Sequence, residues 1–151
     1  MNRSKNRAYG LAKERELGSI LKHYFKSVVV TDPTFPAYDI KAITNDNIIV
    51  YIELKSSIND SIISNNVNMS QRTQLKLLCQ GCNVALIGVS IEGKYGFIDI
   101  DTFTKMSGRI TLDYIKRNGG IVIHRNFSRL IRYVNRLLVT HGHGKVTRDI
   151  P

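Results

Sequence analysis

Three ionisable side chains occupy two apolar runs that flank an Asn/Asp turn. Asp39 stands near the start of the first run, residues 38–44, and Glu53 and Lys55 end the second, residues 48–55. Such runs on either side of a turn predict a β-hairpin. Alternate residues of a strand share a face, so Glu53 and Lys55 point the same way, and the fold-back brings Asp39 to the same end.

Charged groups at the end of an apolar strand indicate chemistry more than packing. Burying a charge is costly unless it is paired or holds a metal ion. Asp39 and Glu53 can supply the oxygen ligands of a hard cation, and Lys55 can handle a proton or stabilise negative charge. Asp32 is a rival carboxylate, but Asp39 is preferred because its strand adjoins the strand of Glu53.

A helix predicted over residues 6–25 contributes a further carboxylate. At helical spacing Glu14 lies near the edge of the apolar stripe, so its side chain is expected to turn inward. Glu16 lies well away from the stripe and is expected in solvent, paired with neighbouring bases. Gly10, also near the edge, would let another backbone approach closely. The stripe itself consists of Leu17, Ile20, Leu21 and Tyr24.

These residues resemble a known nuclease signature. Asp39 followed by Glu53-Leu54-Lys55 resembles the motif of PD-(D/E)XK nucleases, although Pro36 is not adjacent to Asp39 as in the formal Pro-Asp pair. The segment 9–17, with basic residues before it, is similar to the first helix of archaeal-type Holliday junction resolvases. In that family a glutamate on this helix completes the metal site, and Glu14 holds the matching position.

The resemblance implies an α/β fold of the restriction-endonuclease-like type, in which helices flank a central mixed sheet. It implies Mg²⁺, with Mn²⁺ able to substitute, held by Asp39, Glu53 and the Leu54 carbonyl, with Glu14 bound directly or through water. Lys55 would orient the nucleophile or stabilise the transition state. It further implies in-line hydrolysis that leaves a 5′-phosphate, and a homodimer.

Basic residues are concentrated at the two ends of the chain. Of the formal net charge of +10, residues 1–26 carry +5, residues 27–108 carry −2 and residues 109–151 carry +7. A polyanion such as DNA is the expected partner. General solubility charge and an anionic membrane surface are the alternatives. In the first segment Arg3, Lys5 and Arg7 are predicted to contact DNA.

A second helix is predicted over residues 68–80. Asn68 and Gln71 have the spacing of a capping box, and the apolar face includes Leu75. In the resembled family a glutamine or a basic residue early in this helix lies close to the metal site. Gln71 is therefore either a cap or a site residue, and Arg72 and Lys76 join it as predicted DNA-binding residues. The preceding stretch, 56–68, is expected to be a loop or a mobile flap.

The last predicted helix, residues 126–139, has an apolar face and an arginine face. Arg129, Arg132 and Arg136, together with Arg125 before them, fall within about 60° of one another. A row of arginines without acids is expected to bind phosphates, although a solvated face is the alternative. His141 and His143 are expected in a disordered tail.

The remaining pattern predicts one nuclease domain over residues 1–151. Short strands are expected at 28–30, 83–91, 95–100 and 121–123, and a short helix at 112–117. Residues 6–100 would form the catalytic core and 101–151 a C-terminal elaboration. Cys79 and Cys82 close a helix instead of opening one, which argues against a thioredoxin-type pair and favours ordinary packing.

Together the residues and the resemblance predict a metal-dependent, structure-selective endodeoxyribonuclease, specifically a Holliday junction resolvase that makes paired nicks in four-way DNA. Two alternatives stay open: another PD-(D/E)XK endonuclease, of restriction, transposon-end or repair type, or a non-catalytic DNA-binding protein of the same fold. No apolar run is long enough to span a membrane, and a soluble intracellular protein is expected.

Overall fold

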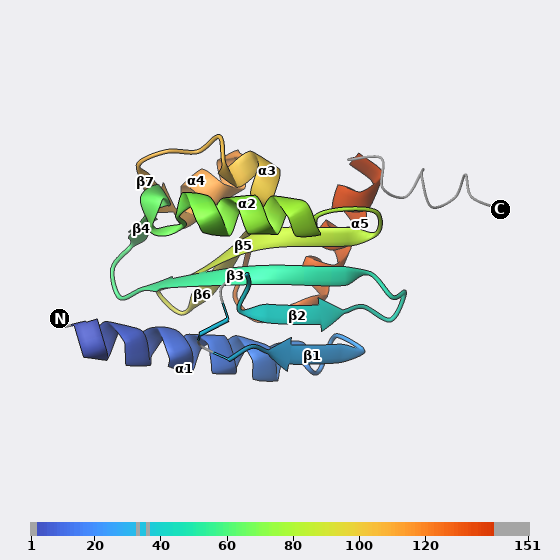
Figure 1. Cartoon of the computed structure of the whole chain (residues 1–151), viewed down its shortest axis with the longest axis horizontal. Helices are drawn as coiled ribbons and strands as arrows, with labels where there is room; N and C mark the ends of the chain where they lie inside the picture. The colour runs from blue at the N-terminus through green and yellow to red at the C-terminus, as the bar shows by residue number, and fades with distance from the viewer. Residues whose placement is uncertain (1–2, 33, 36, 141–151) are drawn as a thin grey trace.

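Six strands form one mixed sheet in the computed structural model, which describes residues 3–32, 34, 35 and 37–140 (Figure 1). The strand order is β1-β2-β3-β5-β6-β8, and only the pair β3–β5 is parallel. A short second sheet pairs β4 with β7. The strands are β1 (Ser27–Val30), β2 (Ile40–Ile43), β3 (Ile49–Ser57), β4 (Ser61–Ile63), β5 (Asn83–Ile91), β6 (Lys94–Asp99), β7 (Arg109–Thr111) and β8 (Ile121–Ile123).

Helices cover both faces of the large sheet. The first apolar core joins α1 and α5 to one face, and the second joins α2, α3 and α4 to the other. Along β3, Val50, Ile52 and Leu54 enter the first core and Tyr51 enters the second, as alternation requires. This arrangement confirms the predicted α/β class. The helices are α1 (Arg3–Leu21), the 3₁₀ turn η1 (Ser64–Asn66), α2 (Met69–Leu78), α3 (Ile100–Phe103), α4 (Leu112–Arg117) and α5 (Ser128–Thr140).

Close approach of α1 to the sheet occurs at Gly18 and not at Gly10. A Cβ added at Gly18 would overlap the Val30 side chain of β1, whereas one added at Gly10 would meet nothing within 4 Å. The prediction for Gly10 is therefore wrong. Leu17 and Leu21 are fully buried beside Gly18, so the second half of α1 is the half that packs on the sheet.

Three other expectations are corrected. β1 is an edge strand with alternating exposed and half-buried residues, not a buried strand. Residues 56–68 hold the end of β3, β4 and η1, and β4 is ordered by pairing Ser61 with Thr111. Residues 101–140 add β8 beside β6 and place α5 in the first core, so they form part of the large sheet and of its core. The tail with His141 and His143 lies outside the described residues.

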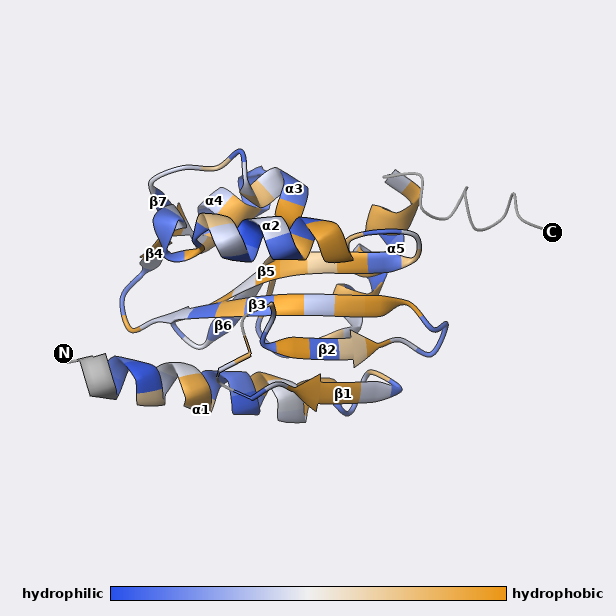
Figure 2. Cartoon of the chain, in the orientation of Figure 1, coloured by the Kyte–Doolittle hydropathy of each residue, from blue (hydrophilic) through white to orange (hydrophobic). Residues whose placement is uncertain are grey.

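The position of the site follows from an unequal strand pairing. β2 pairs with β3 only over Ile49–Ile52, and β3 then continues to Ser57, where no strand of the described residues pairs with it on that side. The first half of α1 lies beside this unpaired part, and α2 lies over β5 on the other face (Figure 1). Figure 2 shows that β3 changes from hydrophobic to polar along the same part.

In the described part of the chain, none of the helices has both the length and the hydropathy of a membrane span.

Candidate active site

Asp39 and Glu53 lie across from each other where β2 begins. The antiparallel ladder of β2 and β3 ends at the pair Ile40–Ile52, so Asp39, which precedes Ile40, and Glu53, which follows Ile52, lie just beyond this end. The Asp39 N–H donates to the Ile52 carbonyl at 2.9 Å, which holds Asp39 against β3. Thr31 holds the other side of Asp39, because its N–H donates to the Asp39 carbonyl at 2.8 Å.

The Asp39 carboxylate takes the place of a missing strand neighbour. It accepts a hydrogen bond of 2.8 Å from the Leu54 N–H, which points to the open edge of β3 because β2 has ended. In a strand the N–H and C=O of one residue point to the same side, so the Leu54 carbonyl is directed to this edge as well. The predicted carbonyl ligand therefore faces the Asp39 side of the strand.

Glu53 is buried and contacts the side chains of Lys55 and Gln71. Lys55 Nζ lies 3.3 Å from Glu53 Oε2, and Gln71 Nε2 donates to the same oxygen at 3.0 Å. Gln71 also accepts at Oε1 from the Asn68 N–H at 3.0 Å, while the Asn68 side chain accepts from the Gln71 N–H at 2.9 Å. The capping box is confirmed, and the two possibilities for Gln71 are not exclusive, since one end of its amide caps α2 and the other contacts Glu53.

Glu14 lies on α1 near enough to Asp39 and Lys55 for their charges to act on its carboxyl group. Its side chain is half-buried, and burial together with the charge of Asp39 raises its pKa from 4.5 to about 7, against the lowering effect of Lys55. Glu16 points elsewhere, as expected: it pairs with Lys13 at 3.1 Å and accepts from the Tyr95 hydroxyl at 2.5 Å.

The surroundings of Glu14, Asp39 and Glu53 disfavour the ionised form of these three carboxyl groups. Burial, together with the charge of Asp39, raises the pKa of Glu53 from 4.5 to about 7, against the lowering effect of the nearby Lys55. Burial also raises the pKa of Asp39, opposed by the Leu54 N–H, by Lys55 and by a hydrogen bond with the Glu53 side chain. The site therefore favours either bound protons or a cation among its oxygens.

The donor set fits a magnesium ion better than a cysteine- or histidine-bound metal. Within the residues that the structure describes, no three His, Cys, Asp or Glu side chains are grouped closely enough to bind a metal by themselves. Mg²⁺ commonly takes one or two carboxylates and completes its octahedron with water and substrate phosphate. Asp39, Glu53 and the Leu54 carbonyl offer that kind of partial oxygen shell.

Residues with competing predictions lie outside this cluster. Asp32 is exposed, and its carboxylate accepts from the Thr34 N–H and hydroxyl, which lowers its pKa. Cys79 and Cys82 are both half-buried, and burial raises the pKa of the Cys79 thiol, which suits a packing residue.

The predicted DNA-binding residues occupy two separate regions. Lys5 and Arg7 are exposed on the half of α1 beside the site, and Lys76 is exposed on α2. Arg72 instead donates to the carbonyls of Val67 and Ser64, so it holds the turn before α2. The side chain of Arg3 lies outside the described residues.

The three arginines of α5 are not brought to the carboxylates. They lie on the helix that covers the opposite face of the sheet from α2. Arg129 donates to the Val122 carbonyl at 2.7 Å, Arg132 is exposed, and the Arg136 guanidinium lies 5.7 Å from the centre of the Tyr133 ring. Their contact with DNA stays a prediction.

Sequence reasoning missed a polar pocket that adjoins the site. It is lined by Asn6 and Tyr9 of α1 and by Ser56 and its neighbours at the end of β3. A partial signal was present, because Asn6 and Tyr9 are three residues apart and therefore share one side of the predicted helix.

The similarity of this chain to known proteins is found in its fold. No family model and no curated protein matches the chain. Among solved structures, Hjc of Archaeoglobus fulgidus, a Holliday junction resolvase from an archaeal hyperthermophile, matches with a TM-score of 0.58. The match covers 76% of this chain and 97% of that one, at 19% identity. The chain has a restriction-endonuclease-like fold. At this identity the likeness concerns the fold, and the resolvase activity is stated of Hjc.

Proposed function

We propose that this protein is a metal-dependent endodeoxyribonuclease that cuts four-way DNA junctions. The observation that carries the proposal is the meeting of Asp39, Glu53 and Lys55 with Glu14 at the open edge of β3. The restriction-endonuclease-like fold, shared with a Holliday junction resolvase, supports it.

Asp39, Glu53 and the Leu54 carbonyl would hold Mg²⁺, or Mn²⁺ in its place, with Glu14 completing the site directly or through water. When bound, such an ion lowers the pKa of its water and neutralises charge on the phosphate. The Leu54 N–H fixes the rotamer of Asp39, and Gln71 does the same for Glu53. These contacts hold both carboxylates in place before substrate arrives.

Lys55 would act on the substrate side of the cluster. Its ammonium lies 3.3 Å from Glu53 and is partly exposed, so it can turn towards a phosphate or a water while remaining close to the carboxylates. There it would orient the attacking water or stabilise the negative charge that develops on the phosphate.

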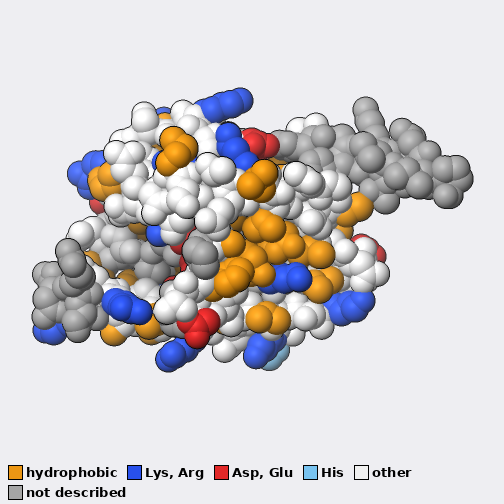
Figure 3. All heavy atoms as spheres, viewed as in Figure 1, with side chains coloured by type: hydrophobic (Ala, Val, Ile, Leu, Met, Phe, Trp, Pro, Cys, Tyr) orange, Lys and Arg blue, Asp and Glu red, His pale blue; other side chains and the backbone are white. Residues whose placement is uncertain are grey.

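A homodimer is the second part of the proposal, because two symmetric cuts need two sites. The face of the sheet that carries Glu53 and Lys55 continues across Tyr51, Lys41 and Val29, which lie in one cross-strand row. Figure 3 shows apolar side chains gathered over β2 and β3 between α2 and β1. Val29 is 55% exposed at this edge.

A second copy of the chain is the occupant that this apolar face fits. A two-fold interface pairs a patch with itself, so the dimer would carry both catalytic sites on elements joined to one interface. Val29→Glu should give a monomer in sedimentation and replace paired nicks by single nicks. Val139→Glu, at a similarly exposed valine on α5, is the control. A dimer that survives Val29→Glu places the interface elsewhere.

The decisive experiment compares a labelled immobile four-way junction with linear duplex of the same sequence, in Mg²⁺ and in EDTA. Symmetric paired nicks on the junction, lost in EDTA and in Asp39→Asn, Glu53→Gln or Lys55→Ala, are expected. Asp32→Asn, at the exposed carboxylate, should cut normally. Equal cutting of both substrates would indicate another nuclease of this fold, and binding without cutting would indicate a non-catalytic DNA-binding protein.

A further inference from the structure

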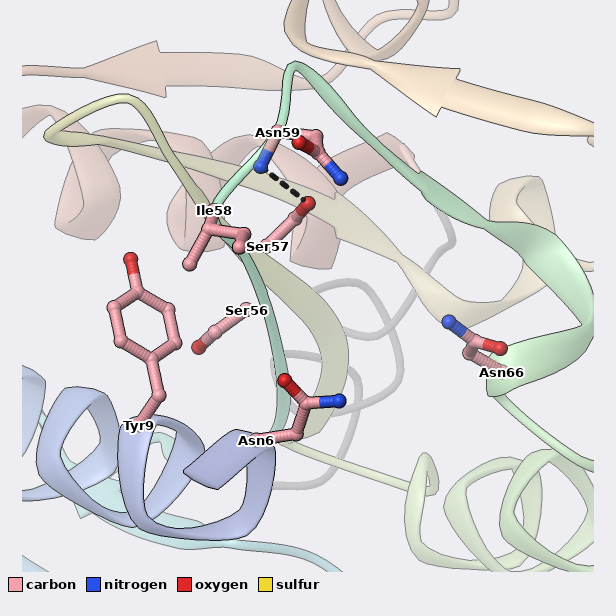
Figure 4. A pocket seen from close by; sticks show the side chains of 7 residues that line it. All are labelled: Asn6, Tyr9, Ser56, Ser57, Ile58, Asn59 and Asn66. Atoms are coloured by element: carbon pink, nitrogen blue, oxygen red, sulfur yellow. Dashed lines mark hydrogen bonds between the residues drawn. The ribbon is translucent and has the colours of Figure 1, made fainter. Parts of the chain in front are cut away.

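A polar pocket of about 450 Å³ opens between α1 and the end of β3. Figure 4 shows Asn6 and Tyr9 projecting from α1 towards Ser56 and Ser57, with Asn66 of η1 across the opening. Its volume is within the range of small-molecule sites. The full lining consists of Asn6, Tyr9, Ser56, Ser57, Ile58, Asn59 and Asn66, none of which is charged.

The floor of the pocket holds an unsatisfied hydroxyl. Ser56 Oγ is buried and has no hydrogen-bond partner, and among the described side chains it is the one such buried atom. Its cross-strand neighbour Ser90 hydrogen-bonds with Tyr95, which donates to Glu16. Ser90, Tyr95 and Glu16 hydrogen-bond with one another and not with Ser56. A ligand in the pocket can supply the hydrogen bond that the Ser56 hydroxyl lacks. Leaving a buried polar group unpaired is costly, which makes a ligand contact here favourable.

The pocket lies beside the carboxylate cluster along both α1 and β3. On α1, Tyr9 lies five residues before Glu14, and on β3, Ser57 lies two residues after Lys55, or about 7 Å along the strand. A DNA strand whose phosphate lies at Lys55 would therefore place an adjacent nucleotide at this opening.

The chemistry of the lining selects a nucleobase over a phosphate. Three asparagine amides and two serine hydroxyls offer neutral donors and acceptors, the groups that pair with base edges. The Tyr9 ring offers an aromatic surface on which a base can stack. A phosphate would instead require the cationic groups that these seven residues lack.

We propose that this pocket receives one nucleobase turned out of the DNA stack beside the phosphate that is cut. The inference rests on the proposed nuclease function and specifies its substrate. Unpaired or weakly stacked bases at a branch point cost the least to turn out, so the pocket would favour branched DNA over perfect duplex.

The test measures how much one base contributes to binding. The cut position is first mapped with wild-type protein, and abasic sites are then placed at each nucleotide flanking it. Affinities are measured with Glu53→Gln protein so that the junction stays intact. Loss of the accommodated base should weaken binding about fivefold or more at one position. Adding Ser56→Ala or Asn66→Ala should abolish that difference between intact and abasic DNA.

Two features make the result specific. Ser56→Ala removes no hydrogen bond of the free protein, so its stability should not fall. Asn65→Ala, at an exposed neighbour on η1 outside this pocket, should keep the full abasic effect. No abasic effect at any position, or one that persists in both pocket variants, would overturn the inference. Absence of wild-type cutting on every DNA would instead count against the nuclease function, which the same mapping step tests separately.

Discussion

Replacing Glu53 by glutamine should stabilise the metal-free protein at alkaline pH, although Glu53 lies at the centre of the site. Glu53 has a pKa of about 7 in the folded protein, against 4.5 for an ordinary glutamate, because burial and Asp39 disfavour its charge. A folded-state pKa above the unfolded value stabilises the protein at low pH. That contribution is complete below pH 4.5 and is lost as the pH rises through 7.

The size of the effect follows from the pKa difference. Each pKa unit corresponds to about 1.4 kcal/mol, so ionised Glu53 costs the fold about 3 kcal/mol at pH 8. Glu53→Gln removes this charge, and the Gln71 amide can still donate to the new side-chain oxygen. The stability difference between variant and wild type should thus grow by about 3 kcal/mol between pH 4.5 and pH 8. In a domain of this size that is about 10 °C in Tm.

The assay is urea unfolding in EDTA across this pH range, followed by circular dichroism. Glu92→Gln, at an exposed turn position between β5 and β6, is the control and should follow the wild-type pH dependence. Saturating Mg²⁺ at pH 8 should raise the Tm of the wild type more than that of Glu53→Gln, since binding to the folded state alone stabilises it. A Glu53→Gln stability difference that is constant with pH would refute the account of a charge-crowded site.

Two further predictions test the elements around the site. Gly10→Ala should stabilise the protein by about 1 kcal/mol, because α1 has open space there, whereas Gly18→Ala should destabilise it by forcing a Cβ against Val30; thermal unfolding distinguishes them. Arg132→Ala should weaken DNA binding and reduce the salt slope by about one, while Lys116→Ala on α4 should not, as measured by fluorescence anisotropy against salt; an unchanged slope would assign the arginine row to solvent.

Local patterns were sufficient for most of the elements. The strand at 83–91, the helix at 112–117 and the strand at 121–123 have the predicted bounds, because alternation, continuous apolar runs and glycine ends act within a few residues. The cap of α2 was predictable for the same reason, since Asn68 and Gln71 satisfy each other three residues apart. The position of β1 at the edge of the sheet was not predictable, because three valines in a row do not indicate which neighbours a strand has.

Long-range pairing explains what local pattern could not indicate. Residues 56–68 are polar and rich in serine and asparagine, which suggested a flap, yet Ile62 is buried because β4 pairs with β7 far along the chain. The same holds for Gln71, whose second contact, with Glu53, exists only after α2 packs beside β3.

The sequence by itself determined which groups are available for chemistry: Asp39, Glu53 and Lys55 on a hairpin, and Glu14 on the inner side of a helix. Spacing and alternation are local, so they can be read from the chain. Only the tertiary structure decided that these groups lie near one another. β2 stops pairing with β3 after Ile52, and α1 lies beside the open edge of β3. The carboxylates there are partly or fully buried near one another, and both burial and the neighbouring charge raise their pKa values. The pocket at Ser56 arises in the same way, because a cavity and an unpaired hydroxyl depend on how distant segments pack.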